Sequence, residues 1–239
     1  MTSKFNLDAK LNSKDDCGVC GIPLIYQATP ISKSCIFCGE IHNTNIYCPE
    51  GHYVCDSCHS AEAIQILRNV LNSSNSTNPV EILETILAHP ALPLHGPEHH
   101  SIVPAVIVAA VKNTGYSVPE EAIEQAIKRG TKVPGGWCGF YGACGAAIGV
   151  GIAISIIKEA TPLTGKPRSL AIEATSNALS NMVDGHPRCC KRSSRRSIEI
   201  AIKFLQEELD IKLGNNQPMA CSYSERNKEC VKAKCAYYM

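Results

Sequence analysis

Fourteen cysteines among 239 residues constrain this chain more than any other feature. They form two groups: seven lie from Cys17 to Cys58, seven lie from Cys138 to Cys235, and the stretch between the groups has none. The sequence begins with a polar segment that lacks the apolar core of a secretory signal, so we expect a cytoplasmic protein. Thiols stay reduced in that compartment, and closely spaced cysteines there indicate metal ligation rather than disulfides.

The first group consists of four tight ligand pairs, a pattern that suits two tetrahedral zinc ions, because a two-residue gap lets one turn present both sulfurs to one metal. Only Tyr53 and Val54 separate the third pair from the fourth, which favours a crossed arrangement. One ion then takes Cys17, Cys20, Cys48 and His52, and the other takes Cys35, Cys38, Cys55 and Cys58. A sequential pairing stays open. In either case we expect structural zinc, which replaces a core in a segment too small to form one.

Apolar residues outside the cysteine pairs recur at helical spacing, and strand signals are sparse. Helices are predicted within 61–71, 78–89, 117–130, 169–185 and 197–214. Asn78 and Pro79 have the residue types of a helix start, Ser117 and Glu120 match a capping box, and Gly130, Gly185 and Gly214 are expected stops. The predicted fold is therefore mainly α: a zinc-binding module over 1–60, a helix and linker over 61–78 with a hinge at 72–78, and a cysteine-rich helical domain over 79–239.

The stretch from Gly135 to Ile157 contains no charged residue and is long enough to cross a bilayer. From Gly142 onward, however, it is built from glycine, alanine and other small residues rather than from the large apolar residues typical of a lipid-facing span. The neighbouring predicted helices are amphipathic, and the mean hydropathy of the chain is −0.05. We therefore expect a buried central helix and no membrane span.

The second cysteine group lies within and beyond this glycine-rich frame, which leaves space and backbone N–H groups for an iron–sulfur cluster. Cys189 and Cys190 are adjacent in the sequence, and the basic residues beside them, Arg188, Lys191 and Arg192, favour their thiolate forms. One set of four ligands, Cys138, Cys144, Cys189 and Cys190, leaves three in the carboxyl-terminal tail; division of the adjacent cysteines between two sites, and inert thiols, are the alternatives. If metal orders the tail, we expect it to fold back onto the body near Cys138 and Cys144. These seven candidates for cofactor binding are Cys138, Cys144, Cys189, Cys190, Cys221, Cys230 and Cys235.

A third constellation lies in the cysteine-free middle of the chain. It contains His95, Glu98, His99 and His100, which are the candidates for catalytic residues if the protein is an enzyme. Three histidines and a carboxylate at a helix entry suit metal binding or proton transfer, and capping and loop hydrogen bonds are the alternative. The spacing of the first three matches the inverted zinc-protease motif, but the intervening Gly96 and Pro97 disfavour the helix that this motif needs.

Several stretches resemble an uncharacterised domain-of-unknown-function family, 5714, of anaerobic archaea and bacteria. They are "CGVCGIPL", "CIFCGE", "CPEGHYVCDSCH", "HGPEHHSIVPA", "VPGGWCGFYGACGAAIGVGIA", "RCCKR" and "CSYSERNKECVKAKCAYY", and they extend over nearly the whole chain. Members of that family occur with radical-SAM and methyltransferase modules. The resemblance implies a role in anaerobic cofactor or sulfur chemistry, and it implies no particular reaction.

These observations favour an iron–sulfur and zinc metalloprotein that serves a partner enzyme as a redox or sulfur-handling accessory protein. A zinc-based interaction adaptor without chemistry and a metal-dependent enzyme centred on His95, Glu98 and His99 are the alternatives. The formal net charge is +1, and 5% of the residues are aromatic, so the sequence gives no strong nucleic-acid signal.

Overall fold

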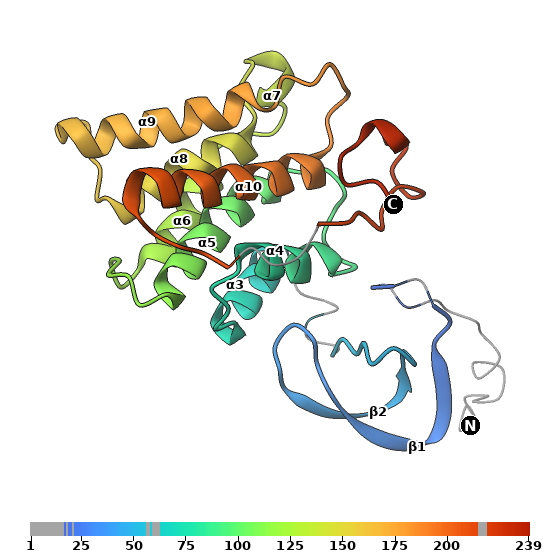
Figure 1. Ribbon diagram of the computed structural model, residues 1–239. Coiled ribbons are helices and arrows are strands. Elements are labelled where there is room, and N and C mark those ends of the chain that lie inside the picture. The colour runs from blue at the N-terminus through green and yellow to red at the C-terminus, as the bar shows by residue number, and fades with distance from the viewer. Residues whose placement is uncertain (1–16, 18, 21, 56–57, 59–62, 215–218) are drawn as a thin grey trace, which may run out of the picture.

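The computed structural model describes residues 17, 19–20, 22–55, 58, 63–214 and 219–239, and it contains a small β-hairpin module beside a larger helical body (Figure 1). The module is built from the amino-terminal cysteine region. The body contains the α-helices described below, and the carboxyl-terminal tail folds against one end of it. The fold is thus mainly α, as the sequence predicts.

The module contains two antiparallel strands, β1 (Ile25–Ser34) and β2 (Ile41–Tyr47). Ile25 pairs with Tyr47 and Ser34 pairs with Ile41, with an irregularity in register between Tyr26 and Ile31. Isoleucine, tyrosine and threonine favour extended backbone. The sequence analysis did not predict this hairpin, because both strands are largely exposed and alternate only weakly between apolar and polar residues.

The described part of the body forms eight α-helices: α3 (Ala63–Ser73), α4 (Pro79–Ala88), α5 (Glu98–Asn113), α6 (Ala122–Gly130), α7 (Trp137–Phe140), α8 (Gly145–Ile157), α9 (Gly165–Ser180) and α10 (Cys190–Leu209). A short 3-10 helix, Lys232–Lys234, follows in the tail. Helix α4 begins as expected, because the side chain of Asn78 accepts a hydrogen bond from the backbone N–H of Val80 and Pro79 occupies the first turn.

Other helix ends differ from the prediction. Helix α6 ends at Gly130 but begins at Ala122, so the expected capping box from Ser117 to Glu120 does not form. Helix α9 ends at Ser180, before Gly185. Helix α10 ends at Leu209 rather than Gly214, because Asp210 takes the left-handed conformation with φ of 52°. The last of these caps is hard to foresee, since glycine is the usual residue in that conformation.

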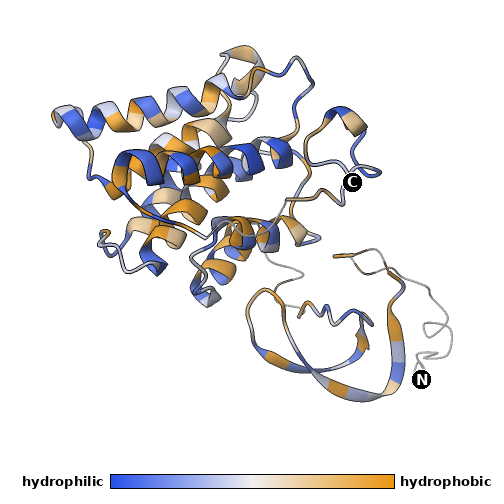
Figure 2. Ribbon diagram, in the orientation of Figure 1, coloured by the Kyte–Doolittle hydropathy of each residue, from blue (hydrophilic) through white to orange (hydrophobic). Residues whose placement is uncertain are grey.

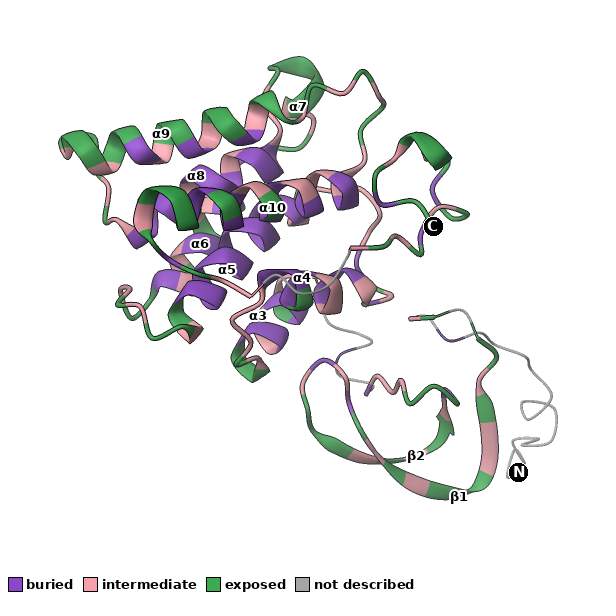
Figure 3. Cartoon of the chain, viewed as in Figure 1, coloured by how far each residue is buried: buried purple, intermediate pink, exposed green. Residues whose placement is uncertain are grey.

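Helices α5 and α8 form the centre of the body. Every residue of α5 from His99 to Val111 is buried, and α8 lies across it with small residues at the contact (Figure 3). Apolar residues concentrate on these two helices, whereas α9 and α10 carry polar faces (Figure 2). The stretch that could have spanned a bilayer is therefore a buried helix from Gly145 onward, and none of the described helices is long and apolar enough to cross a membrane.

The segment expected to be a hinge is held on both sides by hydrogen bonds. The Asn113 side chain donates to the backbone carbonyls of Ser74 (3.1 Å) and Ser76 (2.8 Å). The backbone N–H of Gly214 donates to the carbonyl of Thr77 at 3.1 Å. Residues 72–78 thus connect the end of α5 to the segment that follows α10.

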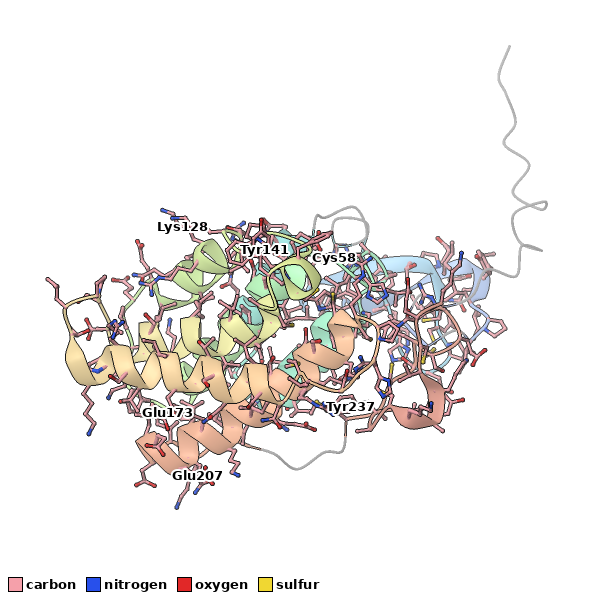
Figure 4. All side chains as sticks on the ribbon, turned by 90° about the horizontal axis from the view of Figure 1, so that it is seen from above. Cys58, Lys128, Tyr141, Glu173, Glu207 and Tyr237 are labelled. Carbon is pink, nitrogen blue, oxygen red and sulfur yellow. The ribbon has the colours of Figure 1, made fainter. Side chains whose placement is uncertain are left out.

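The tail folds back onto α4 and α10. The Tyr223 hydroxyl donates to the carbonyl of Leu87 at the end of α4, and the Tyr237 hydroxyl donates to Glu199 on α10 at 2.7 Å. Tyr237 is labelled in Figure 4, where the tail lies beside α10. This position differs from the expected one near Cys138 and Cys144, because these tyrosines attach the tail to the other side of the adjacent pair Cys189 and Cys190.

Candidate metal centres

The first group of cysteines forms two compact ligand sets in the crossed arrangement. Each set places its four ligand atoms within 4.8 Å of one another. The first set is Cys17, Cys20, Cys48 and His52, and the second is Cys35, Cys38, Cys55 and Cys58. Tetrahedral Zn–S bonds of about 2.3 Å would place ligand atoms about 3.8 Å apart, so both sets fit the donors and dimensions of a zinc site.

Individual contacts in these sets agree with that geometry. In the first set, the Cys20 and Cys48 sulfurs are 3.5 Å apart, and Nδ1 of His52 lies 3.6 Å from the Cys48 sulfur. In the second set, the Cys38 and Cys55 sulfurs are 3.8 Å apart. Gly39 follows Cys38 with φ of +76°, a conformation that lets the chain turn tightly around a metal.

The electrostatics of the second set also favour a cation. Burial raises the pKa of the Cys35 thiol, but the backbone N–H groups of Cys55, Cys38 and Phe37 outweigh burial and lower the pKa to about 7. Burial raises the pKa of Cys58, and the neighbouring thiols raise it further. A divalent ion would replace the protons that such a crowded set otherwise retains.

The seven cysteines of the second group lie around two cavities instead of forming compact sets. Among the described residues, no three of them bring their sulfurs within 4.8 Å of one another. A cluster spans several metal atoms, so its thiolates stand farther apart than the ligands of a single ion. Within the described residues, these cysteines therefore do not form by themselves a site compact enough for a single ion.

One cavity, which we call the tail cavity, lies between the tail and the start of α10. Its volume is about 20 Å³, roughly the space of one or two waters. The Asn227 side chain donates to the Cys189 sulfur at 3.6 Å, which connects the tail to this wall. Four cysteines line the tail cavity: Cys189, Cys221, Cys230 and Cys235.

The other cavity, which we call the wide cavity, has a volume of about 410 Å³. Cys138, Cys144 and Cys190 line it, and Cys138 is exposed to solvent. Cys189 also reaches its wall. Of the adjacent pair, Cys189 therefore faces both cavities, whereas Cys190 faces only the wide one.

The electrostatic neighbours of the adjacent pair follow the same division. Burial raises the pKa of both thiols. For Cys189, the negative charges of Cys221 and Cys235 raise it further, whereas Arg192 lowers it. For Cys190, the charges that raise the pKa come from Cys144, Cys189 and Cys138.

Three helices begin at the wide cavity. Its walls contain His99 and His100 from the start of α5, Cys144 and Gly145 at the start of α8, and Cys190 at the start of α10. Neither α8 nor α10 has an acidic residue in its first turn. The positive ends of these two helix dipoles therefore favour thiolates and other anions at this position.

The two adjacent histidines have fixed tautomers. His99 donates from Nε2 to the carbonyl of Pro93 at 3.2 Å and accepts at Nδ1 from Ser194 at 3.0 Å; burial, reinforced by the charge of Lys191, lowers its pKa to about 3. His100 donates from Nδ1 to the carbonyl of Val133 at 2.8 Å, which leaves Nε2 with a lone pair. An added methyl group on Gly145 would lie 2.5 Å from that Nε2 atom, so the ring packs directly on the start of α8.

The other candidate catalytic residues do not form a metal-binding set with these histidines. Nε2 of His95 lies 3.1 Å from the Asn227 side chain and 3.3 Å from Glu229, so it contacts the tail. No ligand group within the described residues unites His95, Glu98 and His99. The geometry gives no support to the enzyme alternative centred on them.

Residues 67–238 match the model of a family of unknown function, DUF5714. The chain belongs to this family. The matched range contains the whole second cysteine group but begins at Leu67, so the resemblance of the amino-terminal stretches lies outside it. No curated protein and no solved structure matches the chain. The wide and tail cavities are therefore features of the DUF5714 region, and the paired zinc-type sites precede it.

Sequence reasoning pointed to several of the basic and histidine residues that line the cavities but missed others. Asn227 and Arg196 give no signal of their own, since each reaches its cavity only through the way the tail and the start of α10 fold. Asp184 forms ion pairs with Arg192 at 3.2 Å and with Arg196 at 3.9 Å.

Proposed function

We propose that this protein is an iron–sulfur and zinc metalloprotein that handles electrons or sulfur for a partner enzyme in anaerobic metabolism. The observation that carries the proposal is the division of the second cysteine group at the Cys189–Cys190 step. Four thiols line the tail cavity, and Cys138, Cys144 and Cys190 line the wide cavity, which Cys189 also reaches.

The two cavities would serve different purposes. A centre bound by the four thiolates of the tail cavity would have no free position, which suits electron transfer. A cluster there would occupy space that the tail now closes to about 20 Å³. The wide cavity offers three thiols and space beside them, which suits a centre that contacts a substrate. The amino-terminal zinc ions would shape the module without taking part in the chemistry.

Exposed apolar residues beside the wide cavity support a protein partner. Phe140 and Val183 are 87% and 86% exposed, and Val183 lines the cavity itself. Tyr141 is 72% exposed. Apolar side chains grouped at a cavity mouth are typical of interaction sites. We expect a radical-SAM or methyltransferase enzyme to dock here.

Anaerobic purification followed by iron, sulfide and zinc analysis tests the proposal. We expect zinc together with iron and acid-labile sulfide, and a brown protein. The variants Cys221→Ala and Cys190→Ala should each lower iron and leave zinc unchanged, whereas Cys55→Ala should lower zinc and leave iron unchanged. A colourless protein that carries zinc alone after anaerobic reconstitution would refute the proposal.

The adaptor alternative rests on a specific observation: only the amino-terminal ligand sets, among the described residues, are compact enough for a single ion. The adaptor predicts zinc without iron. It also predicts that Cys189→Ala and Cys190→Ala leave partner binding and biological activity intact.

A further inference from the structure

The wide cavity has space beside its thiols that a metal centre bound to them would leave open. Three thiols, from Cys138, Cys144 and Cys190, lie on its wall, and a volume of about 410 Å³ extends beside them. Cys189 reaches the same wall, but its sulfur accepts a hydrogen bond from Asn227 and it lines the tail cavity with three further thiols. A centre bound by the first three thiols alone would keep one position for a ligand from outside.

The cavity wall carries one uncommitted positive charge. Arg188 is exposed and has no hydrogen-bond or ion-pair partner among the described residues. The other two arginines are engaged: Arg192 pairs with Asp184 and donates to the carbonyl of Pro187 at 2.8 Å, and Arg196 donates to the carbonyl of Asn181 at 2.9 Å. Arg188 directly precedes the adjacent cysteines, so its guanidinium is available to a ligand that enters beside them.

We propose that the wide cavity binds a small anionic ligand that carries both a metal-binding donor and a carboxylate. The donor completes the centre held by Cys138, Cys144 and Cys190, and the carboxylate pairs with Arg188. A guanidinium matches a carboxylate in a bidentate geometry, and the starts of α8 and α10 favour negative charge at the same position. This inference rests on the proposed function, because it needs a metal centre at these thiols.

His100 offers the competing fourth ligand. Its Nδ1–H is fixed on the carbonyl of Val133, an arrangement common among metal-binding histidines, and its Nε2 lone pair is free. If His100 completes the centre, a ligand from outside has no position on the metal. The experiment must therefore separate the two outcomes.

Thioglycolate and 2-mercaptoethanol form a matched pair of probes, since both carry a thiol and only thioglycolate carries a carboxylate. The test titrates each into the anaerobically reconstituted full-length protein and follows the absorption and electron paramagnetic resonance spectra. We expect thioglycolate to perturb the spectra at a concentration about tenfold lower than 2-mercaptoethanol, which is the usual effect of one charge-assisted pair.

Arg188→Gln should bring the two half-saturation concentrations together by weakening thioglycolate alone. Arg168→Gln is the matched control, because Arg168 is also exposed but lies on α9 outside the wall of this cavity, and it should keep the tenfold difference. Cys221→Ala should keep the response, since it changes only the tail cavity.

Two results would overturn the inference: equal responses to the two probes in the wild-type protein, or a response that appears only in His100→Ala. The proposed function would stand in both cases, because the protein still binds iron. A protein that takes up no iron overturns both, and the metal analysis identifies that case before any titration.

Discussion

At the scale of single residues, His99 connects the pH of the solution to the stability of the fold. The His99 ring is fully buried at the start of α5 between Ser194 and Pro93. Burial lowers its pKa to about 3 from the ordinary 6.5. The unfolded chain therefore takes up a proton at this residue below pH 6.5, whereas the folded protein does so only near pH 3.

We predict that this histidine destabilises the fold as the pH falls from 6.5 toward 3, by on the order of 1 kcal/mol per pH unit within that window, and contributes no pH dependence above it. Urea denaturation of the wild-type protein and of His99→Gln at pH 7, 5.5 and 4.5 measures the effect. The variant should be less stable at pH 7 but should lose less stability on acidification. Parallel profiles of stability against pH for the two proteins would contradict the assignment of this pH dependence to His99. Loss of zinc at low pH would affect both proteins equally, so the comparison between them is unchanged.

Glu84 and Arg195 form an ion pair in which one partner is almost completely removed from water. The guanidinium donates to both carboxylate oxygens, at 2.6 and 2.7 Å, and the Arg195 side chain is 1% exposed. Glu84→Gln would leave a buried charge without its counter-ion. We predict a loss of about 2–3 kcal/mol in the free energy of unfolding, below the full cost of breaking a buried pair because Glu84 is 31% exposed.

The matched control is Glu124→Gln. Glu124 also accepts two hydrogen bonds from an arginine, Arg68, but both side chains are exposed, so the change should cost less than about 1 kcal/mol. Chemical denaturation of both variants compares the two pairs directly. Equal losses would mean that burial does not set the strength of the pair on α10.

The sequence predicts the grouping of the candidate metal ligands in the amino-terminal module better than in the helical body. The spacing favours the crossed grouping of the first cysteines, since only Tyr53 and Val54 separate the third pair from the fourth, and the structure decides it against the sequential pairing. The division of Cys189 from Cys190 does not follow from spacing, because adjacent residues carry the same spacing information. It depends on where Tyr223 and Tyr237 attach the tail.

At the scale of helices, glycines set how closely α5, α6 and α8 approach one another. A methyl group added to Gly130 would lie 2.5 Å from the carbonyl oxygen of His100 and 2.5 Å from the Cα of Ser101, both backbone atoms of α5. Gly149 on α8 is similarly close to Pro104, at 2.8 Å. Backbone cannot yield locally, so a larger residue forces the helices apart.

We predict that Gly130→Ala lowers the free energy of unfolding by about 1–3 kcal/mol, the usual cost of overpacking, although alanine favours helix. Gly165→Ala is the control. Gly165 lies in α9 with nothing within 4 Å of an added methyl group, so this change should be neutral or slightly stabilising. Thermal unfolding followed by circular dichroism measures both. A neutral Gly130→Ala would mean that α5 and α6 are not in close contact.

Helical elements follow from the sequence where local signals decide them, as in α4, whose Asn78 cap and Pro79 are read directly. The hairpin of β1 and β2 could not be predicted this way. Its strands hold few buried residues, and the turn between them is formed by the Cys35 to Glu40 segment of the second ligand set. The cysteine spacing of the second ligand set, rather than apolar periodicity, is the sequence signal at that element.

At the scale of the whole molecule, the module and the body share one apolar core. Cys35, Phe37 and Cys58 belong to the same buried cluster as residues of α3 and α5. The Phe37 ring lies 4.1 Å from the His89 ring at the end of α4, and Asn69 on α3 donates to the Cys58 sulfur at 3.7 Å. Figure 4 labels Cys58 at this junction. The second ligand set therefore joins the module to the body.

The tail is the carboxyl-terminal part of the DUF5714 region, and we expect its folded conformation to depend on metal. Few apolar side chains hold it: Tyr223 and Tyr237 are buried, and Met219 is partly buried against the core. Three of the four thiols around the tail cavity come from this segment. A centre bound by these thiols would cross-link the tail to Cys189 and stabilise its folded conformation.

We therefore predict that the tail resists limited proteolysis in the metal-loaded protein and is cleaved after chelation, while the buried helices α5 and α8 stay protected in both states.

A chain that ends at Gly214 should lose the metal of the tail cavity and keep the metal bound by Cys138, Cys144 and Cys190, so its iron content should fall without reaching zero. The triple variant Cys221→Ala, Cys230→Ala, Cys235→Ala, which keeps the tail, should give the same iron content. Proteolysis followed by mass spectrometry and iron analysis measure the two effects. If the truncated chain keeps the full iron content and an unchanged absorption spectrum, the tail cysteines bind no cluster.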